Sequence, residues 1–135
     1  MKTYLFSFEK LDVWKDAHAL VLLTFTATKK FPTSERFGLS NWMKQSSINI
    51  VSNISLGSGP VPRKEQVVFY QLAYSAGMEL LNQALIARDL GYLTPEHCLE
   101  YRIHLEMVTG KINALRKSVL TKTLEAAAEV WFPFL

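Results

Sequence analysis

Residues 48–57 constrain the fold of this chain more than any other segment. They set small polar residues within a helical apolar pattern that stops at Gly57. Serine and asparagine are mediocre helix formers, because their side chains compete for backbone hydrogen bonds. A helix with several of them needs close helix–helix approach or specific hydrogen bonds along its packed face. The small polar residues in and beside this segment include Ser47, Ser52, Asn53 and Ser55.

The apolar spacing predicts four helices, over residues 11–30, 34–57, 63–90 and 95–122. Their boundaries are marked by Phe31-Pro32, by the loop of residues 57–62 with two glycines and two prolines, and by Gly91 followed by Thr94-Pro95. Short loops between long helices favour antiparallel neighbours. The sequence therefore predicts one all-α domain over residues 1–135, an antiparallel up-down-up-down four-helix bundle.

The expected core face of the third helix includes Leu72 or Ala73, and Leu80 or Leu81. Glu79 lies within this apolar helix and is a candidate for burial beside a lysine, an arginine or the Asn53 amide. The apolar positions of the fourth helix are Leu99, Ile103, Met107, Ile112, Leu115 and Val119, with Gly110 between them.

Apolar surface is expected to remain for a partner subunit, because 49% of the residues are hydrophobic and only 20% are charged. The C-terminal tail, residues 124–135, is too apolar at its end to stay in water. It is expected either to pack across the bundle or to dock on a neighbouring subunit. The candidate partner contacts are Trp131, Phe132, Phe134 and Leu135.

No pattern in the sequence predicts an enzyme, a cofactor or a metal site. The loop of residues 57–62 lacks the arrangement of a phosphate-binding P-loop. His97, Glu100 and His104 share one helix face, but a metal would need further ligands from another helix, so a solvated face is expected. Cys98 is expected to be a buried, inert thiol.

The expected location is the cytoplasm. A single cysteine allows no internal disulfide, and the N-terminal residues lack the apolar segment of a signal peptide. The apolar stretch at residues 19–27 is shorter than the roughly 20 residues that cross a bilayer, so no membrane partner is expected.

The basic residues are the sequence feature that most favours a particular function, although the formal net charge is only +3. In a monomer a solvated basic face is the favoured interpretation, but an oligomer would repeat each patch around an axis. Binding of RNA or DNA is therefore the first hypothesis, and a protein-interaction scaffold that uses apolar helix faces and the tail is the alternative. Lys122 lies beside the candidate nucleic-acid-binding residues, which are Lys44, Arg63, Lys64, Lys111, Arg116 and Lys117.

The chain resembles the small four-helix bundle proteins related to the 23S ribosomal-RNA intervening-sequence protein. The resemblance rests on residues 8–17, Phe31-Pro32, residues 35–39, residues 52–54 with Gly57, Glu79-Leu80 with Gln83, and residues 90–93. It implies a left-handed bundle, a homopentamer and no catalytic residues. A similar bundle, the accessory variability protein of retroelements, binds nucleic acid and a reverse transcriptase.

The chain departs from this family at two places. Lys44-Gln45-Ser46 stands where many relatives carry a pair of arginines, and Leu56 stands where an acidic residue usually precedes the glycine. Fewer phosphate contacts mean lower affinity, so these changes weaken the argument from resemblance for RNA binding.

Overall fold

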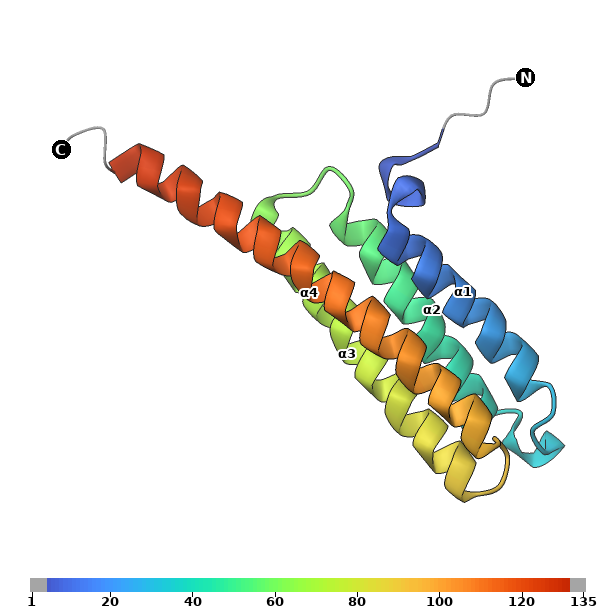
Figure 1. The fold of residues 1–135 in the computed structure, drawn as a ribbon. Helices are drawn as coiled ribbons and strands as arrows, with labels where there is room; N and C mark the ends of the chain where they lie inside the picture. Colours follow the sequence, from blue (N-terminus) through green and yellow to red (C-terminus); the bar gives the residue numbers. More distant parts are fainter. Residues whose placement is uncertain (1–4, 132–135) are drawn as a thin grey trace.

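The part of the protein that the structure describes is built mainly of four α-helices (Figure 1). The computed structural model describes residues 5–131, with side chains through residue 128. Within these residues there is no strand, which confirms the all-α prediction. The helices are α1 (Asp12–Thr28), α2 (Leu39–Gly57), α3 (Arg63–Asp89) and α4 (Pro95–Trp131), and short 3₁₀ helices η1 (Ser7–Lys10) and η2 (Thr33–Glu35) precede α1 and α2.

The start of α2 differs from the prediction. Residues 33–35 form η2, and the α-helix begins at Leu39 rather than at residue 34. Glu35 helps to start it, because its carboxylate accepts a hydrogen bond from the Leu39 backbone N–H at 3.0 Å. An acid at this position also favours the positive end of the helix dipole.

The end of α4 differs as well. The helix continues to Trp131 instead of ending at residue 122, because residues 124–129 are good helix formers. Its final turns project past the other helices (Figure 1). Leu124 is 72% exposed, so this part of the tail does not pack across the bundle. The side chain of Trp131, and residues Phe132, Phe134 and Leu135, lie outside the described residues.

The signals that predicted the start of α4 are confirmed. The Thr94 hydroxyl accepts a hydrogen bond from the His97 backbone N–H at 3.1 Å, and Pro95 is the first helical residue. Gly91 has a φ of 80°, a conformation that glycine adopts without strain.

Close helix approach is present, but hydrogen bonds between helices are not its main cause. A Cβ atom on Gly57 would lie 2.7 Å from Tyr70 Cε1, so α2 meets α3 closely at this point. Asn53 and Ser55 instead donate to backbone carbonyls of their own helix, at 2.8 and 3.0 Å. A longer contact joins Ser46 on α2 to Glu79 on α3 at 3.5 Å.

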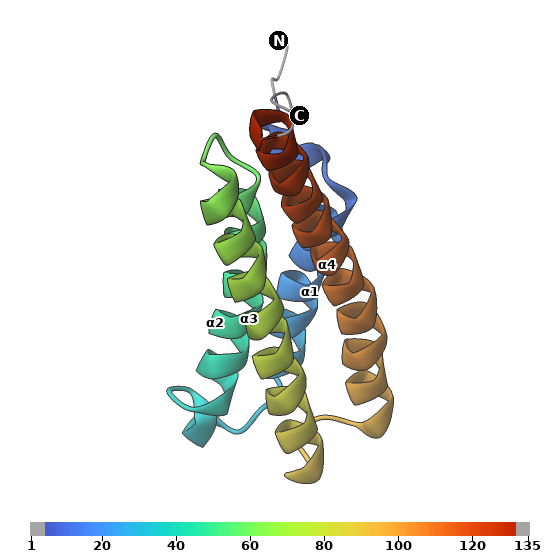
Figure 2. The same cartoon turned by 90° about the vertical axis from the view of Figure 1, so that its left-hand side faces the viewer.

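Each pair of candidate core residues on α3 has one member that is fully buried. Ala73 and Leu80 are fully buried, whereas Leu72 is 48% exposed. Glu79 is exposed, so the hypothesis of a buried carboxylate is wrong. The helices α3 and α4 lie side by side in Figure 1 and Figure 2, and α3 carries the small residues Gly77 and Ala84 where it meets α4.

The helix α4 has two apolar faces. Its core residues are Cys98, Tyr101, Leu105, Val108 and Ile112, all buried. Leu99, Ile103 and Met107 are 55%, 57% and 41% exposed, so they are not core residues. Together with Gly110 they form an apolar stripe on the side of α4 that faces away from the core, because their spacing of three and four places them on one helix face. We call these four residues the α4 stripe.

Contacts between helices pair residues in opposite sequence order. On α1 and α4, Asp16 contacts Lys111 at 2.6 Å, whereas Thr24, later on α1, contacts Tyr101, earlier on α4, at 2.9 Å. On α3 and α4, a Cβ atom on Gly77 would lie 3.1 Å from Thr109, whereas Ala84 contacts Cys98.

Candidate nucleic-acid interface and an adjoining pocket

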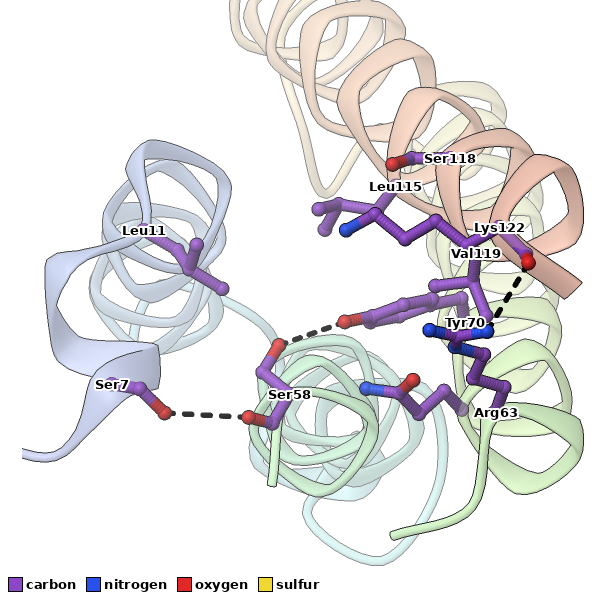
Figure 3. A pocket seen from close by; sticks show the side chains of 10 residues that line it. Ser7, Leu11, Ser58, Arg63, Tyr70, Leu115, Ser118, Val119 and Lys122 are labelled. Carbon is purple, nitrogen blue, oxygen red and sulfur yellow. Dashed lines mark hydrogen bonds between the residues drawn. The ribbon is translucent and has the colours of Figure 1, made fainter. Parts of the chain in front are cut away.

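Several polar side chains meet in a pocket near the end of the bundle from which α4 projects (Figure 3). The pocket has a volume of about 300 Å³. Ser7 of η1 lies on one side, and Ser58 follows α2. Arg63 and Tyr70 belong to the first turns of α3, and Lys122 comes from the projecting part of α4. Residues far apart in the sequence therefore build one site.

Hydrogen bonds fix the walls of this pocket. Ser7 Oγ donates to the Ser58 carbonyl at 3.3 Å, and the hydroxyls of Ser58 and Tyr70 lie 3.0 Å apart. Arg63 Nη1 donates to the backbone carbonyl of Lys122 at 3.1 Å, which joins α3 to α4. Tyr70 is only 3% exposed, so its ring and hydroxyl are held in place by their surroundings.

The pocket has a positive lining. Arg63 and Lys122 are the two charged side chains among its described lining residues, which include no carboxylate. Within the part of the chain whose side chains are described, neither cation lies within 4.0 Å of a carboxylate oxygen. A guanidinium has five N–H donors, and the bond to the Lys122 carbonyl uses one of them.

Two other predicted residues lie exposed near this end of the bundle. Lys64 follows Arg63 in the first turn of α3, and Lys117 lines a shallow depression on α4 together with Lys122 and Glu125. Of the six predicted nucleic-acid-binding residues, Arg63, Lys64 and Lys117 are thus exposed cations at the same end as the pocket. We call them, with Lys122, the basic end.

Lys111 and Arg116 do not share one side of α4. Lys111 forms an ion pair with Asp16 of α1 at 2.6 Å, and this hydrogen bond raises the pKa of Lys111. Arg116 faces the other neighbour and donates to the side chain of Gln71 on α3. These two residues therefore do not form a single basic stripe, and the carboxylate of Asp16 offsets the charge of Lys111.

Lys44 lies elsewhere. Its ammonium is 5.4 Å from the centre of the Phe25 ring, a cation–π arrangement. Phe25 is next to Thr24, which contacts Tyr101. Tyr101 precedes Lys122 on α4 by 21 residues, or about 30 Å of helix. The structure therefore separates Lys44 from the basic end.

The remaining candidate residues show no catalytic arrangement in the described part of the chain. His97 and Glu100 line a separate pocket of about 220 Å³ between α1 and α4, which Lys30 also borders. No group of three His, Cys, Asp or Glu side chains within residues 5–128 could hold a metal ion. Cys98 is buried, as predicted, and its thiol faces the Ala84 carbonyl at 3.8 Å.

Ser58, Tyr70 and Lys122 are the pocket residues that the sequence did not single out as a group. Ser58 belongs to a loop and Tyr70 to an apolar helix face, so neither has a local motif around it. Only the packing of three segments brings them together.

The fold and the site define an all-α bundle with exposed cations at one end, and comparison with known proteins assigns its family. The sequence model of the family described as 23S rRNA-intervening sequence protein matches residues 9–114. The chain therefore belongs to the 23S rRNA-intervening sequence protein family, as its residues suggested. The match ends within α4, before the turns that contribute to the pocket.

A search of curated proteins finds no match to this chain. No helix in residues 5–131 is both long enough and apolar enough to span a membrane.

Proposed function

We propose that this protein is a non-enzymatic, oligomeric helical bundle that binds nucleic acid, or a nucleoprotein, through its basic end. The observation that supports the proposal most strongly is the set of exposed cations in the basic end, Arg63, Lys64, Lys117 and Lys122. Within the part of the chain whose side chains are described, none of these four cations lies within 4.0 Å of a carboxylate oxygen, so they can replace the counterions of a phosphate backbone. Membership of a family named for an interruption in ribosomal RNA agrees with a nucleic-acid partner.

Oligomerisation would strengthen this attraction. The family resemblance suggests a homopentamer, and five copies of a +3 chain carry about +15 in total. The α4 stripe supplies an apolar surface that a second copy could cover. Among the described residues, a Cβ atom added to Gly110 would meet no neighbouring atom within 4 Å, so packing within one subunit does not require glycine. Glycine inside a helix nevertheless costs roughly 0.5–1 kcal/mol relative to alanine. A close approach by another subunit would explain why glycine occurs there.

The proposal includes finer features of the architecture. We take the bundle to be antiparallel, up-down-up-down and left-handed. The opposite sequence order of the contacts on α1 and α4, with Asp16 facing Lys111 and Thr24 facing Tyr101, supports the antiparallel arrangement. The handedness follows from the resemblance. A cytoplasmic location agrees with the single, buried Cys98.

Binding can be measured by fluorescence anisotropy with a labelled structured RNA and a labelled DNA duplex. The triple variant Arg63→Gln, Lys64→Gln and Lys117→Gln should weaken binding of all sequences about equally, because phosphate contacts carry no sequence information. The matched control is the triple variant Lys29→Gln, Lys30→Gln and Lys44→Gln. It also removes three positive charges, but these lie near the C-terminal end of α1, away from the basic end. An equal loss of nucleic-acid affinity in both triple variants would show that binding depends on overall charge rather than on the basic end.

A second candidate function is a protein-interaction scaffold, and the exposed α4 stripe favours it. In this alternative, Ile103→Glu would abolish capture of a protein partner, while neutralising the basic end would have no effect. Ile103 is 57% exposed, so the fold should tolerate the substitution. Absence of RNA and DNA binding at low salt, with a protein partner lost in Ile103→Glu, would replace the first proposal with the second.

A further inference from the structure

The pocket of Figure 3 has a chemistry that general binding to a nucleic-acid backbone leaves unexplained. Its α4 wall consists of Leu115, Ser118, Val119 and Lys122. All four lie after residue 114, where the match to the family ends. The α4 wall of the pocket therefore lies outside the region that matches the family, whereas most of its other walls lie inside it.

The polar groups of the pocket are suited to an anion. Arg63 is held by the Lys122 carbonyl, and its remaining N–H donors stay available. The Lys122 side chain extends from α4 over Tyr70 toward the middle of the pocket (Figure 3). The hydroxyls of Ser58 and Tyr70 lie 3.0 Å apart, and because one of them donates to the other, one hydroxyl proton remains for a ligand.

The charge of the lining favours a terminal phosphate over an internal phosphodiester. A phosphomonoester carries roughly −1.5 to −2 at neutral pH, which matches two cations in a described lining without a carboxylate. A phosphodiester has a single negative charge and a substituent on each side. Because η1, α3, α4 and the segment after α2 all contribute walls, the pocket suits a group that ends inside it.

The remaining space fits the organic part of such a molecule. A volume of about 300 Å³ exceeds what a phosphate group fills, and Leu11, Leu115 and Val119 provide apolar surface beside the cations. We propose that this pocket binds the terminal phosphate of a phosphomonoester, with Arg63 and Lys122 as its charged ligands. The phosphomonoester can be a free mononucleotide or the phosphorylated end of a nucleic-acid strand, and only the second source rests on the proposed function.

Isothermal titration calorimetry on the full chain tests the pocket itself, with AMP, inorganic phosphate and adenosine as probes. AMP and phosphate should bind saturably, and adenosine should not. Arg63→Gln and Lys122→Gln should each weaken AMP binding by about tenfold or more, the fold-change that follows from loss of a charged hydrogen bond. Lys122→Gln keeps the backbone carbonyl that holds Arg63, so it tests the ammonium alone.

The control is Lys29→Gln, an exposed charge outside the pocket, which should bind AMP as the wild type does. Circular dichroism should show equal helix content in all variants. Absence of saturable binding of both AMP and phosphate would overturn the proposal. So would unchanged AMP affinity in folded Arg63→Gln and Lys122→Gln.

A second titration identifies the source of the phosphate. Two oligonucleotides of one sequence, with a 5′-phosphate and a 5′-hydroxyl, are compared by anisotropy. A strand end is the source if the phosphorylated strand binds more tightly than the hydroxyl strand. This difference should disappear in Lys122→Gln, and AMP should compete with the phosphorylated strand. Equal binding of both strands, with AMP still held by the pocket, supports a free mononucleotide. AMP binding without any strand binding would refute the proposed function but keep the pocket assignment.

Discussion

The buried hydrogen bond between Tyr101 and Thr24 gives a sharp prediction about how α4 is held to α1. Tyr101 and Thr24 are both fully buried. The tyrosine hydroxyl donates to Thr24 Oγ1 at 2.9 Å, and Thr24 Oγ1 donates to the Leu20 carbonyl at 2.8 Å. Removing the Tyr101 hydroxyl and removing the Thr24 hydroxyl should have unequal consequences.

Tyr101→Phe removes one hydrogen bond but leaves Thr24 bonded to Leu20, so it should lower the free energy of unfolding by about 1 kcal/mol. Thr24→Val keeps the shape of the side chain and leaves the buried phenol hydroxyl without a partner. That substitution should cost roughly 1–3 kcal/mol. In the double variant no polar group is left unpaired, so adding Tyr101→Phe to Thr24→Val should cost nothing or restore stability.

Urea unfolding of the wild type, both single variants and the double variant measures this coupling directly. The reasoning is refuted if the two single costs add to within about 0.5 kcal/mol, the result for independent sites. The titration of Tyr101 offers an independent check on the burial of this hydroxyl.

The pKa of Tyr101 is raised to about 12, chiefly by burial and to a smaller extent by the charge of Glu100, while the hydrogen bond to Thr24 opposes the rise. An unfolded tyrosine has a pKa of about 10. Between these values the folded state keeps a proton that the unfolded state has lost. Its contribution to stability is therefore complete below pH 10 and is lost as the pH rises toward about 12. Tyr101→Phe should show a shallower loss of stability over this range.

Three further predictions concern Gly57, Gly110 and Glu35. Gly57→Ala should lower the free energy of unfolding by about 1–2 kcal/mol, because the new Cβ would lie 2.7 Å from Tyr70 Cε1; a melting temperature equal to that of the wild type would contradict it. Gly110→Ala should weaken self-association in analytical ultracentrifugation. If the assembly is unchanged and the melting temperature rises as helix propensity predicts, no helix packs closely there. Glu35→Ala should cost about 1 kcal/mol in urea unfolding, because it removes the acceptor of the Leu39 N–H at 3.0 Å and of the Tyr92 hydroxyl at 3.3 Å; equal midpoints would argue against this cap.

The sequence predicted those features of the fold that have a local cause. Thr94 and Pro95 mark the start of α4, and Gly91 adopts the positive φ expected after α3. These signals act within a few residues, so spacing alone identifies them. The start of α2 was missed because Glu35 accepts a hydrogen bond from the Leu39 N–H, so the helix begins at Leu39 rather than at residue 34.

The choice between neighbouring apolar residues could not be predicted from spacing. Leu72 and Ala73 both fit the helical period, and the larger side chain is the one left exposed, because close packing of α3 favours the small one. On α4, Leu99 and Ile103 have the spacing of a core face but lie opposite it. A helix with two apolar faces gives two periodic patterns, and only the neighbouring helices decide which one is buried.

The sequence predicted only part of the candidate site, because neighbouring helices also decide which cations are left without a partner. Arg63, Lys64 and Lys117 were singled out by charge, and the structure leaves them exposed near one end of the bundle. Lys111 and Lys44 were singled out equally, but Asp16 pairs with the first and the Phe25 ring holds the second far away. Partners that come from other helices carry no signal in the local sequence.

The salt dependence of binding is the most direct test of nucleic-acid binding through the basic end. Anisotropy titrations with a DNA duplex at several salt concentrations give the slope of log K against log salt, which is about −0.9 for each phosphate contact. We predict tight binding with a steep negative slope in the wild type. The variant without Arg63, Lys64 and Lys117 charges should have a slope shallower by about 2–3, while the Lys29, Lys30 and Lys44 control keeps the wild-type slope. No binding at low salt, or the same slope in all three proteins, would contradict the account.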